Sequence, residues 1–426
     1  MTTSGSERTA FRPALTQAVR SKFALIDECP FIGDRVFLDS ASGSLRLKSV
    51  CDVISAESQL PDQINRDTPG SRHVMETIAR GEEDVRTFLG SGGVVISALT
   101  ATAALFRTIR DAVAHFPGTN VVTTSLDHPA THDALHRWAH VHGKEFRVAA
   151  ACPRTGTVTP DSILDLVDSN TAVIAFIHGS NVTGAYLDAG TIIEEARQIN
   201  GDVCVIIDGV QYAPYAPVDV QDLGADVYVI APYKTYCKKG IGFALLSERF
   251  ARIPHDRVLA KPGDDWHLGS DDHVNYAAWS TTVDYFNWLG SQFTESRSRR
   301  ERVVAAMSAI KDHMGMLLNH LINGSNATPG LRAIDGITLH GIGESLEERS
   351  CVVAMNFEGV DASIMAAKYL ERGIVVQARK SVMSARQLRA LGIEEGGIVR
   401  VSAAHYTSPD SIEHFLRTTT DVTSTL

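Results

Sequence analysis

Cysteine is scarce in this chain, and it is never arranged for a metal or a disulfide framework. The six cysteines among the 426 residues are Cys29, Cys51, Cys152, Cys204, Cys237 and Cys351. No two of them form a CxxC pair, and none stands at zinc-ligand spacing from a histidine. We therefore expect no metal site, and we expect free thiols in a reduced, cytoplasmic protein.

Long basic and long apolar runs are also missing. The formal net charge is −10, and the densest basic stretch, "SRSRRER" at 296–302, is interleaved with Ser and Glu. Nucleic acid and anionic membranes are therefore not expected as partners, and we predict that this stretch forms a solvated helix face. The N-terminus has no apolar core of signal-peptide length. Apolar runs such as "AVIAFI" are too short to span a bilayer.

A glycine fingerprint for a dinucleotide is absent as well. The fingerprint requires glycines directly after a strand, where a helix begins. The glycine-rich "GSGGVVIS" instead precedes its apolar run. This order excludes a nicotinamide-dependent oxidoreductase of the Rossmann type.

Short apolar runs rich in Val and Ile are plentiful in the first two thirds of the chain. They are "GGVVISAL", "NVVTTSL", "TAVIAFIHGS", "VCVIIDGV", "DVYVIAPY" and "GIGFALLS". Consecutive apolar positions are typical of strands buried on both faces, as in a parallel sheet covered by helices. Patterns with helical spacing, such as "TATAALFRTIRDAVAHF", lie between them. The alternation predicts an α/β domain with right-handed crossovers.

The pattern changes after about residue 280. The stretch from "VDYFNW" to "LLNHLI" predicts one or two long helices. Beyond it, strands alternate with fewer and shorter helices, which indicates a smaller α+β domain. We predict four parts: an N-terminal segment, 1–30, that packs on the small domain; a large α/β domain, 31–283; a connecting helix, 284–323; and the small domain, 324–426.

Polar residues end five of the expected strands. They are Thr100, His128, Asn181, Asp208 and Lys234. In open α/β sheets, ligands bind beyond the carboxyl ends of the strands. Each residue alone has an ordinary explanation: most lysines are simply exposed, an aspartate can cap the next segment, and an asparagine can form a turn. Five at one edge of one sheet predict a shared binding crevice.

This set of residues suits pyridoxal phosphate, which needs a lysine for its covalent attachment and an acid beside its ring nitrogen. The sequence resembles the class V aminotransferase family of fold-type I pyridoxal-phosphate enzymes, which includes cysteine desulfurases, selenocysteine lyases and isopenicillin N epimerase. The resemblance covers nearly the whole chain. It rests on "FLDSASGSLRLKSV", "SALTATAAL", "LDHPATHDALHRW", "HGSNVTGAYLD", "DGVQ", "YKTYCKKGIG" and "GIVRVSAAHYTSPDSI", in the family's order. It implies a mainly parallel seven-stranded sheet.

The resemblance also implies roles for individual residues. Lys234 would carry the cofactor and move protons, Asp208 would pair with the ring nitrogen, and His128 would stack on the ring. Asn181 and Gln211 would lie on the phenolate side. The phosphate would meet Thr100, Ala101, Tyr233 and, from the partner subunit of a homodimer, the Gly269–Ser270 pair. Substrate contacts would come from Arg400, which would hold the α-carboxylate, and from Asn181, Ala41 and Arg379.

Four departures from the family pattern affect these expectations. Ala231 stands where a Ser or Thr usually helps to hold the phosphate, and Tyr233 stands where His usually precedes the lysine. Cys237 follows the lysine closely; it is either a packed small residue or a redox or nucleophilic group. The loop from Lys380 to Gly397 has no cysteine, whereas desulfurases carry a mobile cysteine there.

We therefore expect an enzyme that labilises the α-carbon of an amino acid, and we favour a β-eliminating C–S lyase acting on a cysteine S-conjugate. Some family members do this in specialised metabolism, for example in pathways to sulfur-containing sugar antibiotics. Transamination, decarboxylating or oxidative deamination and epimerisation remain open. A persulfide-forming desulfurase is less favoured. A non-catalytic sensor is favoured least, because no basic recognition helix precedes the first strand.

Overall fold

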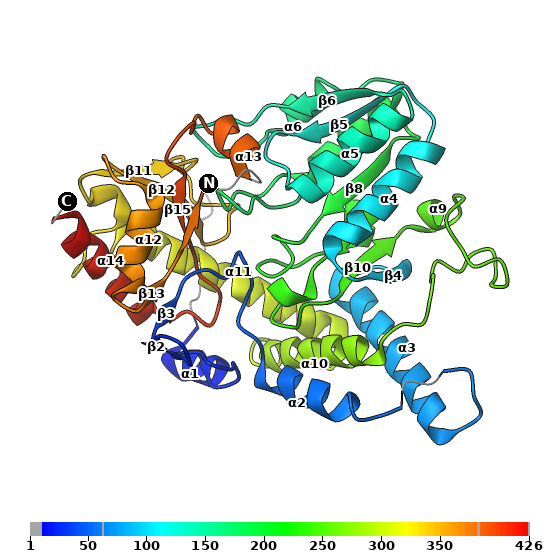
Figure 1. The fold of residues 1–426 in the computed structure, drawn as a ribbon, viewed down its shortest axis with the longest axis horizontal. Coiled ribbons are helices and arrows are strands. Elements are labelled where there is room, and N and C mark those ends of the chain that lie inside the picture. Colours follow the sequence, from blue (N-terminus) through cyan, green and yellow to red (C-terminus); the bar gives the residue numbers. More distant parts are fainter. Residues whose placement is uncertain (1–10, 62–63, 381–383, 425–426) are drawn as a thin grey trace.

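A seven-stranded sheet forms the centre of the larger part of the molecule (Figure 1). The computed structural model describes residues 11–61, 64–380 and 384–424. In spatial order the strands are β4 (Val94–Ala98), β10 (Gly242–Leu246), β9 (Val227–Ile230), β8 (Cys204–Asp208), β7 (Thr171–Ile177), β5 (Asn120–Thr124) and β6 (Glu145–Ala149). β10 is antiparallel to both neighbours and all other pairs are parallel. The predicted α/β fold with a mainly parallel sheet is confirmed.

Helices cover both faces of this sheet and bury alternate residues of its strands in two separate cores. On one face, α4 (Ala101–His115) and α5 (Pro129–Val141) pack against residues such as Val173 and Ile206. On the other face, residues such as Ile174 and Val205 pack with α3 (Pro69–Leu89), α7 (Ala189–Ile199) and α10 (His273–Gly290). Burial on both faces explains why the strands are apolar at consecutive positions.

A second, four-stranded antiparallel sheet lies beyond the long helix α11 (Arg299–Asn323) (Figure 1). Its strands are β11 (Ile337–His340), β12 (Val352–Phe357), β15 (Ile398–Ser402) and β14 (Gln377–Arg379). The helices of this part are α12 (Ala362–Leu370), α13 (Ala385–Ala390) and α14 (Pro409–Thr423). The sequence predicted one or two long helices in this region, and the structure has two, α10 and α11.

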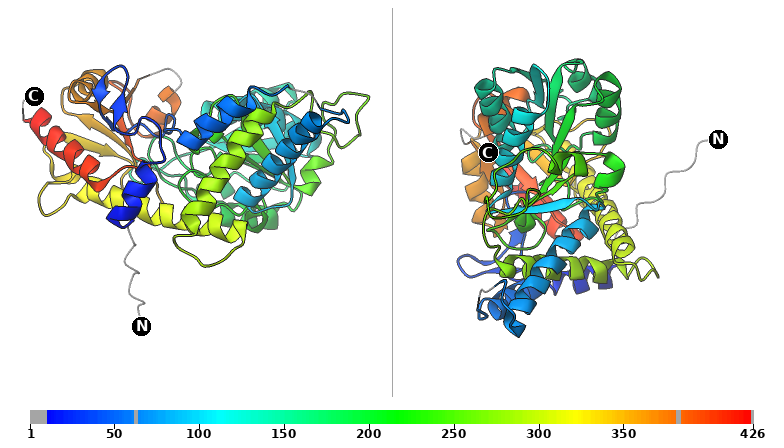
Figure 2. Two further views of the ribbon diagram at one scale, coloured as in Figure 1. Left: turned by 90° about the horizontal axis from the view of Figure 1, so that it is seen from below. Right: turned by 90° about the vertical axis from the view of Figure 1, so that its right-hand side faces the viewer.

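The N-terminal region contacts the C-terminal part although the two are far apart in sequence (Figure 2). The ring of Phe11 stacks on His313 at 4.3 Å, and α1 (Pro13–Arg20) ends with an arginine that donates to the carbonyl of Tyr406. β3 (Val36–Phe37) pairs in parallel with β13 (Ile374–Val375). The short elements β1 (Glu28–Cys29), β2 (Gly33–Asp34) and α2 (Lys48–Glu57) complete this region.

The remaining helical elements are short. They are α6 (Pro160–Leu164), α8 (Val220–Leu223), α9 (Glu248–Ala251), and the 3₁₀ turns η1 (Pro232–Lys234) and η2 (Leu331–Ala333). Among the helices of the described residues, none has the length and apolarity required to cross a membrane.

The prediction of a solvated helix face at 296–302 is wrong for Arg299 and Arg300, while Arg297, Ser298 and Glu301 are exposed. Arg299 bridges Asp84, which is buried, and Asp284. Arg300 donates to Asp219 and to backbone carbonyls at 87, 88 and 218. Both side chains are partly buried, so this stretch docks the start of α11 onto the large sheet's helices and loops.

Candidate active site

The strand ends that the sequence singled out meet around one cavity. The cavity has a volume of about 170 Å³. Its lining residues are Thr100, Ala101, Thr102, Leu105, His128, Ala130, Ile177, Gly179, Asn181, Asp208, Val210, Gln211, Ala231, Tyr233 and Lys234. All five predicted strand-end residues are among them. Their convergence follows from the parallel strands, whose carboxyl ends share one edge of the sheet.

Lys234 lies buried in this cavity wall, in the 3₁₀ turn that directly follows β9. Its Nζ donates to Oε1 of Gln211 at 3.0 Å. Burial, followed by the positive charge of Arg400, lowers the pKa of Lys234 to about 7. A lysine of this kind can exchange protons at neutral pH.

Asp208 ends β8 and is buried close to Lys234. Its Oδ1 accepts from the amide of Val210 at 3.0 Å, and its Oδ2 accepts from the hydroxyl of Thr131 at 3.2 Å. Burial raises the pKa of Asp208, while the Val210 amide and the charge of Lys234 oppose the rise. A cationic N–H would be an effective partner for this carboxylate. Thr131 was missed in the sequence, although it stands one helical turn after His128.

Two further side chains define the cavity wall. His128 caps α5, and its Nδ1 accepts from the amide of Ala130 at 3.1 Å. Burial, followed by the charge of Lys234, lowers the pKa of His128 to about 4, so the ring is neutral at pH 7. Nε2 of Gln211 is buried and makes no hydrogen bond of good geometry in the described part of the chain, although Gln211 lies near the hydroxyl of Tyr215. This unpaired donor calls for an oxygen atom from a ligand.

The 15-residue helix α4 begins at the cavity, and its N-terminus could hold an anion. Thr100 caps the helix by accepting from Ala103, and the first intrahelical bond runs from Ala104 to Thr100. The amides of Ala101 and Thr102 precede that bond and suit a phosphate. Gly242 of β10 makes the close packing possible, because a Cβ there would lie 2.2 Å from the nitrogen of Ala101.

The predicted substrate residues Arg400, Ala41 and Arg379 do not line the cavity. Arg400 is fully buried; it donates to Asp39 at 2.8 Å, to Ser42 at 2.5 Å and to the carbonyl of Asn181 at 2.9 Å. Its Nε has no partner in the described structure. The amide of Ala41 donates to Ser402.

Nε and Nη2 of Arg379 both donate to the hydroxyl of Ser384, and no ion pair to a carboxylate is found for Arg379 among the described residues. Burial, followed by the charge of Arg400, lowers the pKa of Arg379 to about 10. Substrate binding by these residues stays a prediction.

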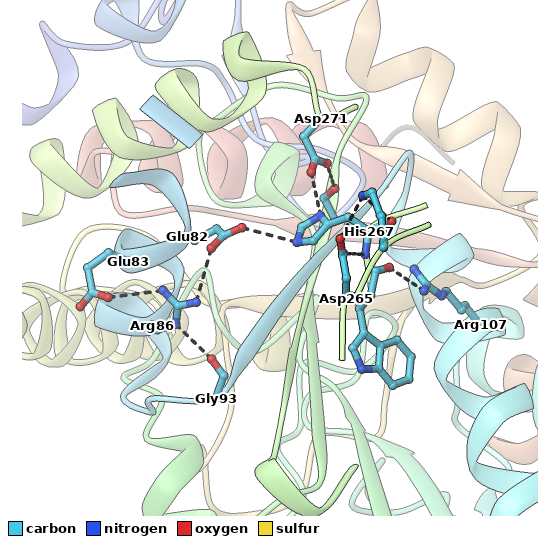
Figure 3. A network of polar contacts seen from close by, with 11 residues as sticks. Glu82, Glu83, Arg86, Gly93, Arg107, Asp265, His267 and Asp271 are labelled. Carbon is cyan, nitrogen blue, oxygen red and sulfur yellow. Dashed lines mark hydrogen bonds and ion pairs between the residues drawn. The ribbon is translucent and has the colours of Figure 1, made fainter. Parts of the chain in front are cut away.

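Gly269 and Ser270 are exposed and also lie outside this cavity. The segment that carries them is held by a polar network around His267 (Figure 3). His267 contacts Asp271 at 2.7 Å and Glu82 at 3.6 Å, and its amide donates to Asp265. The hydrogen bond to Asp271 raises the pKa of His267. A role toward a partner subunit remains a prediction for Gly269 and Ser270.

The model of the aminotransferase class-V family matches residues 36–255, which is more than half of the chain. The chain belongs to the class V aminotransferase family. This class V enzyme is 22% identical to the aminotransferase-like protein FGM3 of Gibberella zeae, over 93% of this chain and 96% of that protein. It is 23% identical to a probable cysteine desulfurase of Halobacterium salinarum, over 87% and 88% of the two chains. The apo structure of a Thermococcus onnurineus cysteine desulfurase superposes with a TM-score of 0.80 at 19% identity, covering 98% of this chain and all of that one.

The class V enzyme is pyridoxal-phosphate dependent, and the cavity suits that cofactor. The unpaired Gln211 donor, the buried Asp208 and the amides of α4 match its phenolate oxygen, ring nitrogen and phosphate. Lys234 would carry the cofactor covalently. The family's hydroxyl three residues before the lysine is replaced by Ala231, which lines the cavity with no hydrogen-bonding side chain.

The helix that follows the loop without a cysteine contacts the cavity-lining residue Asn181. Residues 381–383 of this loop lie outside the described residues, but the helix α13 that follows is anchored. Arg386 donates to the carbonyls of Ser125 at 2.7 Å and Asp127 at 2.5 Å. Gln387 donates to Leu126 and to Asn181. No sequence pattern indicated these contacts, which join segments more than 200 residues apart.

Proposed function

We propose that this enzyme is a β-eliminating C–S lyase that acts on a cysteine S-conjugate. The observation that carries the proposal is the composition of the cavity. It holds the lysine, the acid and the histidine of a pyridoxal-phosphate enzyme, and none of its described lining residues is a cysteine. An enzyme thiol that could accept the substrate's sulfur is therefore missing from the described wall.

Cys237 supports the same proposal. Its side chain is buried and borders a separate pocket of about 520 Å³, on the far side of Tyr233. Burial raises the pKa of the Cys237 thiol, which keeps the thiolate, the nucleophilic form, scarce. A buried, protonated thiol outside the cavity is a poor sulfur acceptor.

In this proposal the protein's residues bind the substrate and move its protons. Pyridoxal phosphate, when bound, supplies an electron sink for the negative charge that develops at the substrate's α-carbon. Lys234 accepts the α-proton on Nζ, and its lowered pKa suits that role. The Cβ–S bond breaks with its electron pair on sulfur, and the thiolate leaves and is protonated. With one water consumed, the products are a keto acid, ammonium and a free thiol.

In this proposal, Arg400 and Arg379 bind the carboxylate of the substrate. Among the described residues, Nε of Arg400 has no hydrogen-bond partner, and the partly buried Arg379 donates only to the hydroxyl of Ser384. We also propose a homodimer in which Gly269 and Ser270 reach the partner's phosphate, since neither lies at the cavity of its own chain.

Transamination is the second candidate, because a relative matched over almost its full length is described as aminotransferase-like. One experiment separates the two reactions. The purified holoenzyme is incubated with a panel of S-substituted cysteines, with and without a keto-acid acceptor, and the products are identified by mass spectrometry. A lyase releases thiol and ammonium without an acceptor. A transaminase needs the acceptor and converts it to an amino acid. Alanine from free cysteine would instead indicate a desulfurase and contradict the proposal.

A further inference from the structure

Gln387 contacts the side chain of Asn181 but does not itself line the cavity. Its Nε2 donates to the backbone carbonyl of Leu126 at 2.7 Å and to Oδ1 of Asn181 at 3.0 Å. Gln387 is fully buried. Its helix, α13, is fixed by the two hydrogen bonds from Arg386 to the segment before His128.

The orientation of both amides follows from the Leu126 carbonyl. A carbonyl oxygen only accepts, so the Gln387 atom that faces it must be the NH₂ group. The same NH₂ group faces Asn181, so the Asn181 atom on that side must be the oxygen. Nδ2 of Asn181 is therefore left for the cavity, which Asn181 lines. Arg400 fixes the backbone of the same residue by donating to its carbonyl at 2.9 Å.

We propose that Gln387 is a positioning residue that makes Asn181 present an N–H donor, and not an oxygen, to the ligand in the Lys234 cavity. Asn181 then favours an anionic or carbonyl oxygen at that point of the cavity. The inference rests on the proposed use of this cavity by the cofactor and substrate. It requires no particular reaction.

The role can be measured on the holoenzyme without any substrate. A donor facing the cavity disfavours positive charge beside Lys234, so it lowers the pH at which the visible absorbance of the lysine-bound cofactor titrates. Gln387→Met removes both hydrogen bonds at nearly constant volume and frees the Asn181 amide to turn. We expect the titration midpoint to rise by up to about 0.7 pH unit, the size of one ordinary hydrogen bond.

A double-mutant cycle separates positioning from a merely structural role. Asn181→Ala should raise the midpoint by itself, and Gln387→Met should add nothing in that background. Asn181→Asp keeps an acceptor for Gln387 but turns an oxygen toward the cavity, so it should raise the midpoint more than Asn181→Ala does. Arg389→Met, an exposed change on the same helix, is the control and should leave the midpoint unchanged.

Two results would overturn the inference: a Gln387→Met shift that persists in the Asn181→Ala background, or Asn181→Asp and Asn181→Ala variants with equal midpoints. The Asn181 variants decide the question if Gln387→Met does not fold. A wild-type protein that gives no visible absorbance with pyridoxal phosphate would instead refute the cofactor chemistry of the proposed function.

Discussion

At the scale of single residues, the burial of Lys234 disfavours its charged form. Its folded pKa is about 7, because burial disfavours the ammonium form. The unfolded chain binds this proton up to a pKa of about 10.4. Between these two pH values the unfolded state holds more protons at this residue, so its contribution to the free energy of unfolding rises with pH.

Lys234→Met should therefore be more stable than the wild type in the cofactor-free protein at about pH 7, and the difference should shrink as the pH rises toward about 10. Urea unfolding of the two proteins at a series of pH values measures this difference. A difference that stays constant over this range would show that the folded lysine keeps an ordinary pKa.

The hydroxyl of Thr131 donates a hydrogen bond to the carboxylate of Asp208. We therefore predict a large loss of kcat for a change of Asp208 and a smaller loss for a change of Thr131. Asp208→Asn removes the charge beside the ring nitrogen and should lower kcat about 100-fold or more, the usual effect of a positioned charge. Thr131→Val removes one hydrogen bond to the carboxylate, and we expect a loss of about tenfold. Thr131→Ser keeps the hydroxyl and serves as the control. An Asp208→Asn variant within about twofold of the wild type would remove Asp208 from this role.

At the scale of elements, the sheet strands were predictable because burial on both faces leaves a direct mark in the sequence. The consecutive apolar residues of β7, β8 and β9 are all buried. The polar residues at their ends then indicated the cavity. These features depend on local sequence, which explains the agreement.

Contacts between distant elements could not be predicted in this way. Gln387 and Asn181 are adjacent in space but carry no shared pattern. Arg299 looks like a solvated charge in the sequence, and only the fold reveals its buried partner Asp84. The engagement of Arg400 by Asp39 likewise requires the N-terminal region to lie beside β15. A single sequence carries no local pattern that indicates which distant elements contact each other in the fold.

Residues 264–272, before α10, form no helix or strand, and the contacts of His267 with Asp271 and Glu82 hold this segment in place. His267 is favoured in its charged form by Asp271, and this raises its pKa above the unfolded value. Its stabilising contribution is therefore complete below about pH 6.5 and is lost as the pH rises through the folded pKa.

Hydrogen-exchange protection of residues 264–272 should fall over that pH range, after correction for the intrinsic exchange rate. In His267→Gln, which stays neutral, the protection should be lower and should no longer depend on pH in this window. A wild-type segment whose protection is independent of pH would contradict the proposed hold on this segment.

For the whole molecule, the account predicts a homodimer with shared sites. Exposed leucines flank the residues concerned: Leu99, beside Thr100, is 79% exposed, and Leu268, beside Gly269, is 51% exposed. Ser270→Asp should weaken cofactor binding in the partner's site, because it would place a negative charge near the phosphate.

Mixing Lys234→Met and Ser270→Asp subunits should then restore up to about one quarter of the activity, because random pairing gives about half of the dimers one intact site. Mixing Lys234→Met with Asp208→Asn should restore none, because both residues belong to the same site of one chain. Sedimentation velocity gives the assembly state in parallel. A monomer, or equal activity in both mixtures, would refute the shared site.

The central claim is that sulfur leaves this enzyme as a free thiol and not through an enzyme cysteine. Its most direct test is the intact mass of the holoenzyme after turnover with S-substituted cysteines and with free cysteine, measured together with the products. The account predicts no sulfane sulfur on the protein, thiol and keto acid as products from a cleaved S-conjugate, and the same result for Cys237→Ala. A persulfide on Cys237 together with alanine as product would contradict the account and identify the protein as a desulfurase.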